Sequence, residues 1–94
     1  MMVEDISRHL ELWSASSLGG SWTKVDENWA HINNCTFSAD RWTNQVSHGE
    51  IQRAGNDESC PISSTGSGCS VLIQGTTGSG DYGQLPYDLG FMHR

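Results

Sequence analysis

A histidine and a glutamate, His48 and Glu50, stand two residues apart in the segment WTNQVSHGEIQR, which covers residues 42–53. On a β-strand, residues i and i+2 point to the same face, so the imidazole and the carboxylate can converge on one ligand. Gly49, between them, would let another part of the chain approach the opposite face closely. Such a pair can hold a metal ion or act as a general acid and base. A structural hydrogen-bonded pair or an exposed strand face explains the same residues, and the pattern alone leaves these readings open.

The aromatic residues offer a second kind of chemistry. Four tryptophans are many for a chain of this length, and their flat, apolar rings stack well on sugars; they are Trp13, Trp22, Trp29 and Trp42. The same residues serve equally as anchors of a core and of turns. No GxSxG nucleophile motif is present, and the GTTGSG run lacks the Gly-Lys-Ser/Thr ending of a phosphate-binding loop. No pair of carboxylates stands out as the acid and base of a glycosidase.

The three cysteines, Cys35, Cys60 and Cys69, fit no zinc-site spacing. Cys60 and Cys69 flank the loop PISSTGSG, and a disulfide closing so short a loop would stabilise the fold by about 2–3 kcal/mol. Two reduced thiols near turns are the alternative. Asn34 begins the tripeptide NCT, which matches the N-glycosylation pattern and hints at secretion.

The elements that must position these residues are short strands. The chain has 94 residues, enough for one small domain, with 35% hydrophobic residues, 17% charged residues and 11 glycines. Alternating or continuous apolar patterns predict five strands joined by turns, an all-β fold. The strands are expected at 8–15, from 22 to 25, at 45–53, at 70–75 and at 89–92. In the strand at 45–53, one face should carry Val46, His48, Glu50 and Gln52. The apolar strand at 70–75 should be buried on both faces. The segment 26–35 reads as irregular, with Trp29 and Ile32 anchoring it to the core.

Charge narrows the classes of partner. The net charge is −6, from 11 acidic and 5 basic residues, and no basic cluster occurs. Nucleic-acid binding is therefore not expected. No apolar stretch approaches membrane-spanning length, and the opening MMVEDISRHL has acids where a secretory signal carries positive charge.

Three blocks of the sequence carry a family resemblance. SASSLGGSWT (residues 14–23) resembles the S-x-SLxGxWT turn of propeller-type furanosidases. WTNQVSHGEIQRAGND (42–57) resembles the WT-x-DISHGE segment of glycoside hydrolase family 62. CSVLIQGTTGSGDYGQLPYDLGFM (69–92) resembles the closing stretch of that family, and the three blocks occur in the family's order.

This resemblance implies a five-bladed β-propeller and an extracellular α-L-arabinofuranosidase. Such enzymes remove arabinose side chains from arabinoxylan with inversion, using an Asp base and a Glu acid. His48 matches the histidine that helps to hold a calcium-type ion in the central channel, with Glu50 and Gln52 supporting that site. Tyr82, with Gly83 beside it, looks like a residue near the arabinose site.

The chain also departs from the family pattern. The catalytic Asp and Glu residues lie upstream of the matching blocks and have no counterpart here, so no catalytic residue is assigned. Residues 1–9 match nothing recognisable, and 10–94 correspond to the C-terminal part of the domain, about the last two blades. We therefore expect a C-terminal fragment that is inactive alone. Cys69 matches a family cysteine whose partner lies in the N-terminal part, which makes Cys60 a substitute partner.

Two other functions stay open from the residues. One is a non-catalytic β module that binds xylan through its tryptophans and Tyr82. The other is a structural β domain without a ligand, stabilised by a Cys60–Cys69 bridge.

Overall fold

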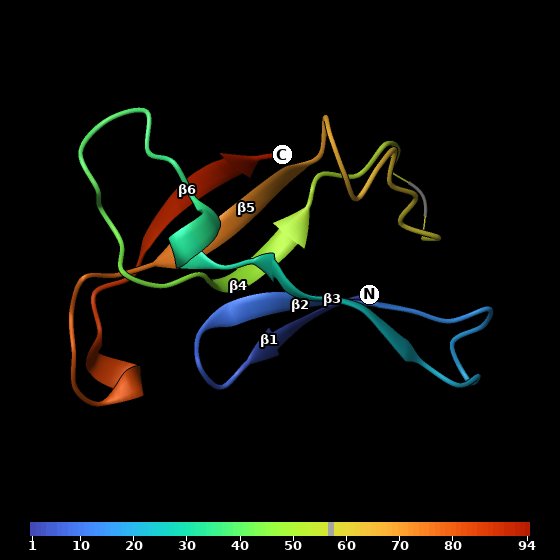
Figure 1. Cartoon of the computed structure of the whole chain (residues 1–94), viewed down its shortest axis with the longest axis horizontal. Coiled ribbons are helices and arrows are strands. Elements are labelled where there is room, and N and C mark those ends of the chain that lie inside the picture. Colours follow the sequence, from blue (N-terminus) through green and yellow to red (C-terminus); the bar gives the residue numbers. More distant parts are fainter. Residues whose placement is uncertain (57) are drawn as a thin grey trace.

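The computed structural model describes residues 1–56 and 58–94 and contains two three-stranded antiparallel sheets (Figure 1). Strands that follow one another in the sequence are neighbours in each sheet, in the orders β1-β2-β3 and β4-β5-β6. The strands are β1 (Met2–Asp5), β2 (His9–Ser14), β3 (Thr23–Ala30), β4 (Ser47–Ile51), β5 (Ser70–Gly75) and β6 (Asp88–His93). Two 3₁₀ turns, η1 (Ile32–Asn34) and η2 (Tyr82–Gln84), complete the secondary structure of the described residues. The predicted all-β class is confirmed.

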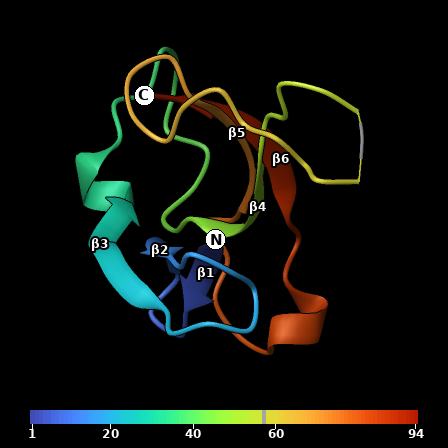
Figure 2. The same ribbon diagram turned by 90° about the vertical axis from the view of Figure 1, so that its right-hand side faces the viewer.

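The core lies between the two sheets, which face each other across it in Figure 2. Both sheets contribute apolar side chains to it; the buried set is Leu10, Leu12, Trp29, Ala30, Val46, Cys69, Val71 and Ile73. Ile32 packs against this set, so the predicted anchoring by Trp29 and Ile32 is confirmed. No helix among the described residues is long and apolar enough to cross a membrane.

The first sheet is longer than the sequence pattern predicts. The pattern does not predict β1, and it predicts an irregular segment at 26–35, whereas β3 continues to Ala30. Leu10 pairs with Ala30, but the register shifts on both sides of Leu12. These irregularities break the two-residue alternation on which strand prediction depends.

Strand β5 corrects another expectation. Val71 and Ile73 are buried, but Leu72 is 37% exposed and pairs with the exposed Phe91 of β6. Within the described residues only one face of this sheet is covered by the other sheet. The continuous apolar run therefore does not mean burial on both faces.

Strand β4 contains a bulge at the residues of greatest interest. The pairing shifts between Ser47 and Gly49, and His48 is the extra residue, with φ at 21°. Val46 and Ser47 are both fully buried, whereas His48 and Glu50 are exposed. The predicted common face of Val46 with His48 and Glu50 is wrong, because the bulge interrupts the alternation.

The expected disulfide between Cys60 and Cys69 does not form in the structure, where all three cysteines are free. Cys69 is 3% exposed, at the end of the core next to β5, and its Sγ lies 3.9 Å from the carbonyl oxygen of Ser70. Cys60 is exposed in the preceding loop, with its Sγ 3.6 Å from the carbonyl oxygen of Glu58. One thiol points into the domain and the other stays in its own loop.

Candidate functional site

The bulge of β4 meets the end of β1 at the carboxylate of Glu4. The hydroxyl of Ser47 donates to this carboxylate at 2.6 Å and the backbone N–H of His48 at 3.2 Å, while Nη1 of Arg8 donates at 3.0 Å. Burial alone would raise the pKa of Glu4, but these hydrogen bonds outweigh it and hold the pKa below its usual value. Glu4 is therefore an anionic centre that joins the two sheets.

The imidazole of His48 faces this centre through Nδ1. That atom lies 3.3 Å from Oε2 of Glu4, 3.3 Å from Oγ of Ser47 and 3.4 Å from the phenol oxygen of Tyr82. No residue that the structure describes bonds to Nε2, and the side chain is 59% exposed. The ring thus keeps one nitrogen available toward solvent.

Tyr82 reaches the site from η2, which begins at this residue. Its ring is half exposed and lies under the guanidinium of Arg8, 4.6 Å from the guanidinium carbon to the ring centroid. The ring of Tyr87 is 5.9 Å away, and its hydroxyl is buried without a hydrogen-bond partner in the described structure. An unsatisfied buried hydroxyl is a place where a water molecule or a polar ligand group would be stabilised. We call Glu4, Arg8, Ser47, His48 and Tyr82 the Glu4 cluster.

The other residues expected at this site lie differently. Glu50 is exposed and pairs with Arg53, at 2.7 Å to Nε, and no contact joins it to His48 among the described residues. Gln52 is exposed, and its backbone N–H donates to the carbonyl of Ser70. Gly83 is exposed next to Tyr82, with open space where a Cβ would stand.

Sequence reasoning missed Glu4 and Arg8. Both lie in the segment 1–9, which carried no motif, and Glu4 is 44 residues from His48. In the sequence, the two residues are related only by their separation of four positions. This spacing is typical of an ion pair on a helix, but here the pair forms across the turn of the β1–β2 hairpin. Only the packing of one sheet on the other brings them to His48.

The groups around His48 offer fewer free oxygen ligands than a calcium ion takes. Ca²⁺ takes six to eight oxygen ligands, whereas Glu4 is already engaged by three donors. The exposed ring of His48 and the nearby oxygens of Glu4 and Tyr82 fit an ion that keeps most of its water. They do not form a complete cage.

A second group of possible metal ligands is Asp5, His9 and Glu11, whose donor atoms lie within 4.8 Å of one another. Glu11 is already satisfied, because Nζ of Lys24 donates to one oxygen at 2.6 Å and Nε1 of Trp13 to the other at 2.7 Å. The lysine ammonium supplies the positive charge that an ion would bring, so this group reads as a structural ion pair.

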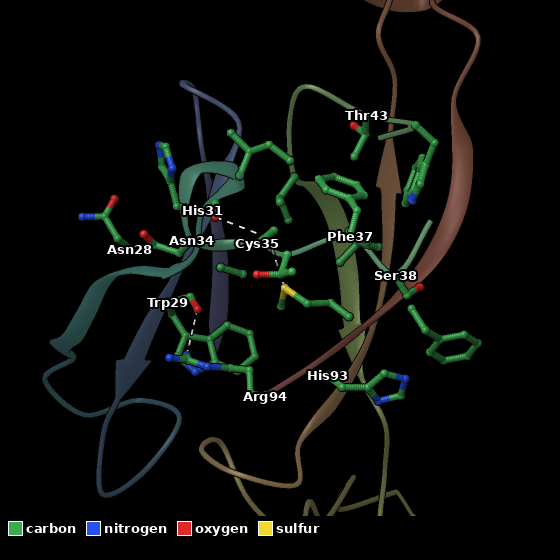
Figure 3. Close-up of a pocket in the computed structure, with 18 residues that line it drawn as sticks. Asn28, Trp29, His31, Asn34, Cys35, Phe37, Ser38, Thr43, His93 and Arg94 are labelled. Atoms are coloured by element: carbon green, nitrogen blue, oxygen red, sulfur yellow. Dashed lines mark hydrogen bonds between the residues drawn. The ribbon is translucent and has the colours of Figure 1, made fainter. Parts of the chain in front are cut away.

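A cavity of about 410 Å³ opens between η1 and β6 (Figure 3), and no residue of the Glu4 cluster is part of its lining. Trp29, Cys35 and Phe37 line it together with Arg94. Burial raises the pKa of the Cys35 thiol, whose Sγ lies 3.4 Å from the carbonyl oxygen of His31. A protonated, hydrogen-bonded thiol is a poor nucleophile.

Comparisons with known proteins agree on one family. The model of glycosyl hydrolase family 62 matches residues 1–93, which include the first nine residues that showed no motif. Alpha-L-arabinofuranosidase C of Cellvibrio japonicus is 35% identical over 92 residues, which cover 90% of this chain and 14% of that protein. The catalytic domain of the GH62 alpha-L-arabinofuranosidase of Coprinopsis cinerea superposes with a TM-score of 0.78 at 36% identity, covering 88% of this chain and 27% of that one. The chain thus spans well under a third of the length of either relative.

Proposed function

The chain belongs to glycosyl hydrolase family 62, and from this premise we propose that it contributes the binding part of an α-L-arabinofuranosidase acting on arabinoxylan side chains. The observation that carries the proposal is the Glu4 cluster. In it the exposed Tyr82 lies beside His48, whose Nδ1 faces the cluster and whose Nε2 is open to solvent. Both relatives are named as arabinofuranosidases, at 35% and 36% identity. We further propose that the two sheets are two blades of a five-bladed propeller in an extracellular enzyme.

In this proposal the residues of the Glu4 cluster bind and orient the sugar, and they do not transfer the proton in the hydrolysis step. Glycoside hydrolysis by inversion needs a carboxylic acid of raised pKa and a separate carboxylate base. Glu4 has a lowered pKa and three hydrogen-bond donors, so it stays ionised and in place. In the family that the chain resembles, the acid and the base lie upstream of the matching blocks. We therefore propose that both lie outside these 94 residues, and we expect the isolated chain to release no arabinose.

Tyr82 and His48 have separate tasks in the proposed site. The half-exposed ring of Tyr82 offers an apolar face and a hydroxyl to a furanose. His48 would hold a calcium-type ion through its exposed Nε2, and that ion would supply positive charge near the sugar. Ser47 and Glu4 fix the histidine through Nδ1 and the backbone.

The alternative of a xylan-binding module gains no support from the tryptophans. The indole N–H groups of Trp13, Trp22 and Trp29 all donate within the chain, and no tryptophan is among the exposed large apolar residues of the described structure. The alternative of a disulfide-stabilised structural domain loses its basis because Cys60 and Cys69 are free.

A chimeric enzyme tests the proposal directly. The aligned part of the Coprinopsis cinerea domain is replaced by residues 1–93 of this chain, and arabinose release from arabinoxylan is measured. We expect the chimera to be active, and Tyr82→Ala to lower kcat/KM about tenfold, equivalent to one lost contact of about 1.4 kcal/mol. Leu18→Ala is the control, because Leu18 is 90% exposed and contacts no residue of the Glu4 cluster in the described structure. A folded chimera that releases no arabinose would refute the proposed function.

A further inference from the structure

Arg8 occupies a backbone conformation that disfavours it. Its φ is +66°, in the left-handed region, at the end of the turn between β1 and β2. Glycine and asparagine adopt this conformation at little cost, whereas a long side chain does not. Strained positions of this kind persist where the surrounding structure holds them, and they concentrate at functional sites. The side chain of Arg8 is therefore the feature to explain.

The backbone of Arg8 is held at both ends. Its N–H donates to the carbonyl of Asp5 at 2.9 Å, which closes the turn, and its carbonyl accepts from the N–H of Val46 at 3.1 Å. The second bond ties the hairpin to the residue just before β4. Figure 1 shows this turn and η2 at the same end of the molecule. From this fixed backbone the side chain of Arg8 can reach both Glu4 in β1 and Tyr82 in η2.

The guanidinium makes two contacts that belong to the Glu4 cluster. Nη1 donates to Oε1 of Glu4 at 3.0 Å, and the guanidinium carbon stands 4.6 Å from the centroid of the Tyr82 ring. The other carboxylate oxygen of Glu4 accepts from the backbone N–H of His48 and faces its ring. One ion pair thus touches the proposed sugar-binding ring and the proposed ion ligand.

We propose that Arg8 is a positioning residue that holds the ring of Tyr82 against His48, with Glu4 fixing the guanidinium in place. Its bearing on sugar binding rests on the function proposed above. The hold itself is a property of the chain without any ligand. Tyr82 lies on a three-residue turn and is half exposed, so the contacts of its ring decide its orientation.

Three variants of Arg8 and one control separate this role from a merely structural one. Arg8→Gly removes the side chain and relieves the left-handed backbone, so we expect it to fold with a melting temperature near that of the parent chain. Arg8→Asn also suits this backbone and serves as the second variant. Arg8→Lys keeps the charge but loses the planar group. Arg53→Gly is the matched control, since it removes an arginine paired with Glu50 that touches no tyrosine in the described structure.

The readout is the rotamer distribution of Tyr82, measured by NMR three-bond couplings about χ1 in the full chain without sugar or ion. A cation–π contact at a partly exposed site corresponds to about a two- to fivefold population ratio. We expect the population of the parent Tyr82 rotamer, relative to the others, to fall by this factor in Arg8→Gly and Arg8→Asn. It should recover in part in Arg8→Lys and should not change in Arg53→Gly. Folded Arg8→Gly and Arg8→Asn chains with an unchanged Tyr82 would overturn the inference, whatever happens to their stability.

The result stands apart from the chimera assay. An inactive chimera refutes the proposed enzyme function but does not touch the measured hold on Tyr82. An active chimera, combined with a Tyr82 that ignores Arg8, refutes only the positioning role.

Discussion

Gly49 stands between His48 and Glu50, and the structure says why no larger residue fits. A Cβ built on Gly49 would lie 2.9 Å from the carbonyl oxygen of Leu72 and 3.2 Å from Cδ1 of Leu10. Its φ is not in the left-handed region, so the requirement is space and not backbone conformation. The contact comes from the neighbouring strand and from the first sheet. We therefore expect Gly49→Ala to destabilise the fold.

The magnitude follows from which atom must move. The carbonyl of Leu72 belongs to the central strand β5, which pairs with β4 and β6 on its two sides, so it cannot yield alone. Overpacking of this kind costs about 1–3 kcal/mol. Removing glycine from the unfolded chain offsets about 0.4–1 kcal/mol of that. A net loss of about 1–2 kcal/mol lowers the melting temperature of a domain of this size by about 4–16 °C.

The assay is thermal unfolding followed by circular dichroism, with Gly83→Ala as the matched control. Gly83 also has no left-handed φ, and a Cβ there meets nothing within 4 Å. We expect Gly83→Ala to melt at or slightly above the parent chain. A Gly49→Ala chain that melts as high as the parent, or a control that loses as much, would show that the close approach to Leu72 does not limit this position.

Three further predictions concern charge, thiols and the ion. The hydrogen bond from Lys24 lowers the pKa of Glu11 in the folded chain. The ionised carboxylate therefore stabilises the fold above its usual pKa of about 4.3, and this stabilisation is lost as the pH falls through the lower pKa of the folded state. The urea midpoints of unfolding at pH 7 and pH 3 should differ less in Glu11→Gln than in the parent chain. Cys60 is exposed and Cys69 is buried, both free, so a thiol reagent should label Cys60 at once and Cys69 only on unfolding, and protection of both would contradict the structure. His48→Ala should weaken Tb³⁺ binding, followed by sensitised luminescence, about tenfold or more, and unchanged binding would exclude this histidine as a ligand.

The sequence predicted the second sheet better than the first. Its apolar run at 70–75 and the closing segment at 89–92 match β5 and β6 almost residue for residue. These two strands pair with each other in a regular register along their whole length, so local pattern and final structure agree. β3 was only half recognised, because register shifts around Leu12 scramble the alternation that a strand shows in sequence.

The candidate site also contains residues that the sequence predicted and residues that it did not. His48 and Tyr82 were predicted through the SHGE and DYGQLPY motifs, since each motif is contiguous in the chain. The structure places their side chains together, with the Tyr82 phenol oxygen 3.4 Å from Nδ1 of His48. Glu50 was expected beside His48 by strand geometry, but it pairs with Arg53 instead.

The sequence alone therefore determined the all-β class, the family resemblance and two residues of the Glu4 cluster, His48 and Tyr82. These depend on composition and on motifs whose residues are neighbours in the chain. Only the tertiary structure decided that Glu4 and Arg8 complete the site, that His48 sits on a bulge, and that Cys60 and Cys69 stay apart. Each of these depends on how one sheet packs on the other or on where a strand slips its register, and contacts across 44 residues leave no periodic signal in the chain.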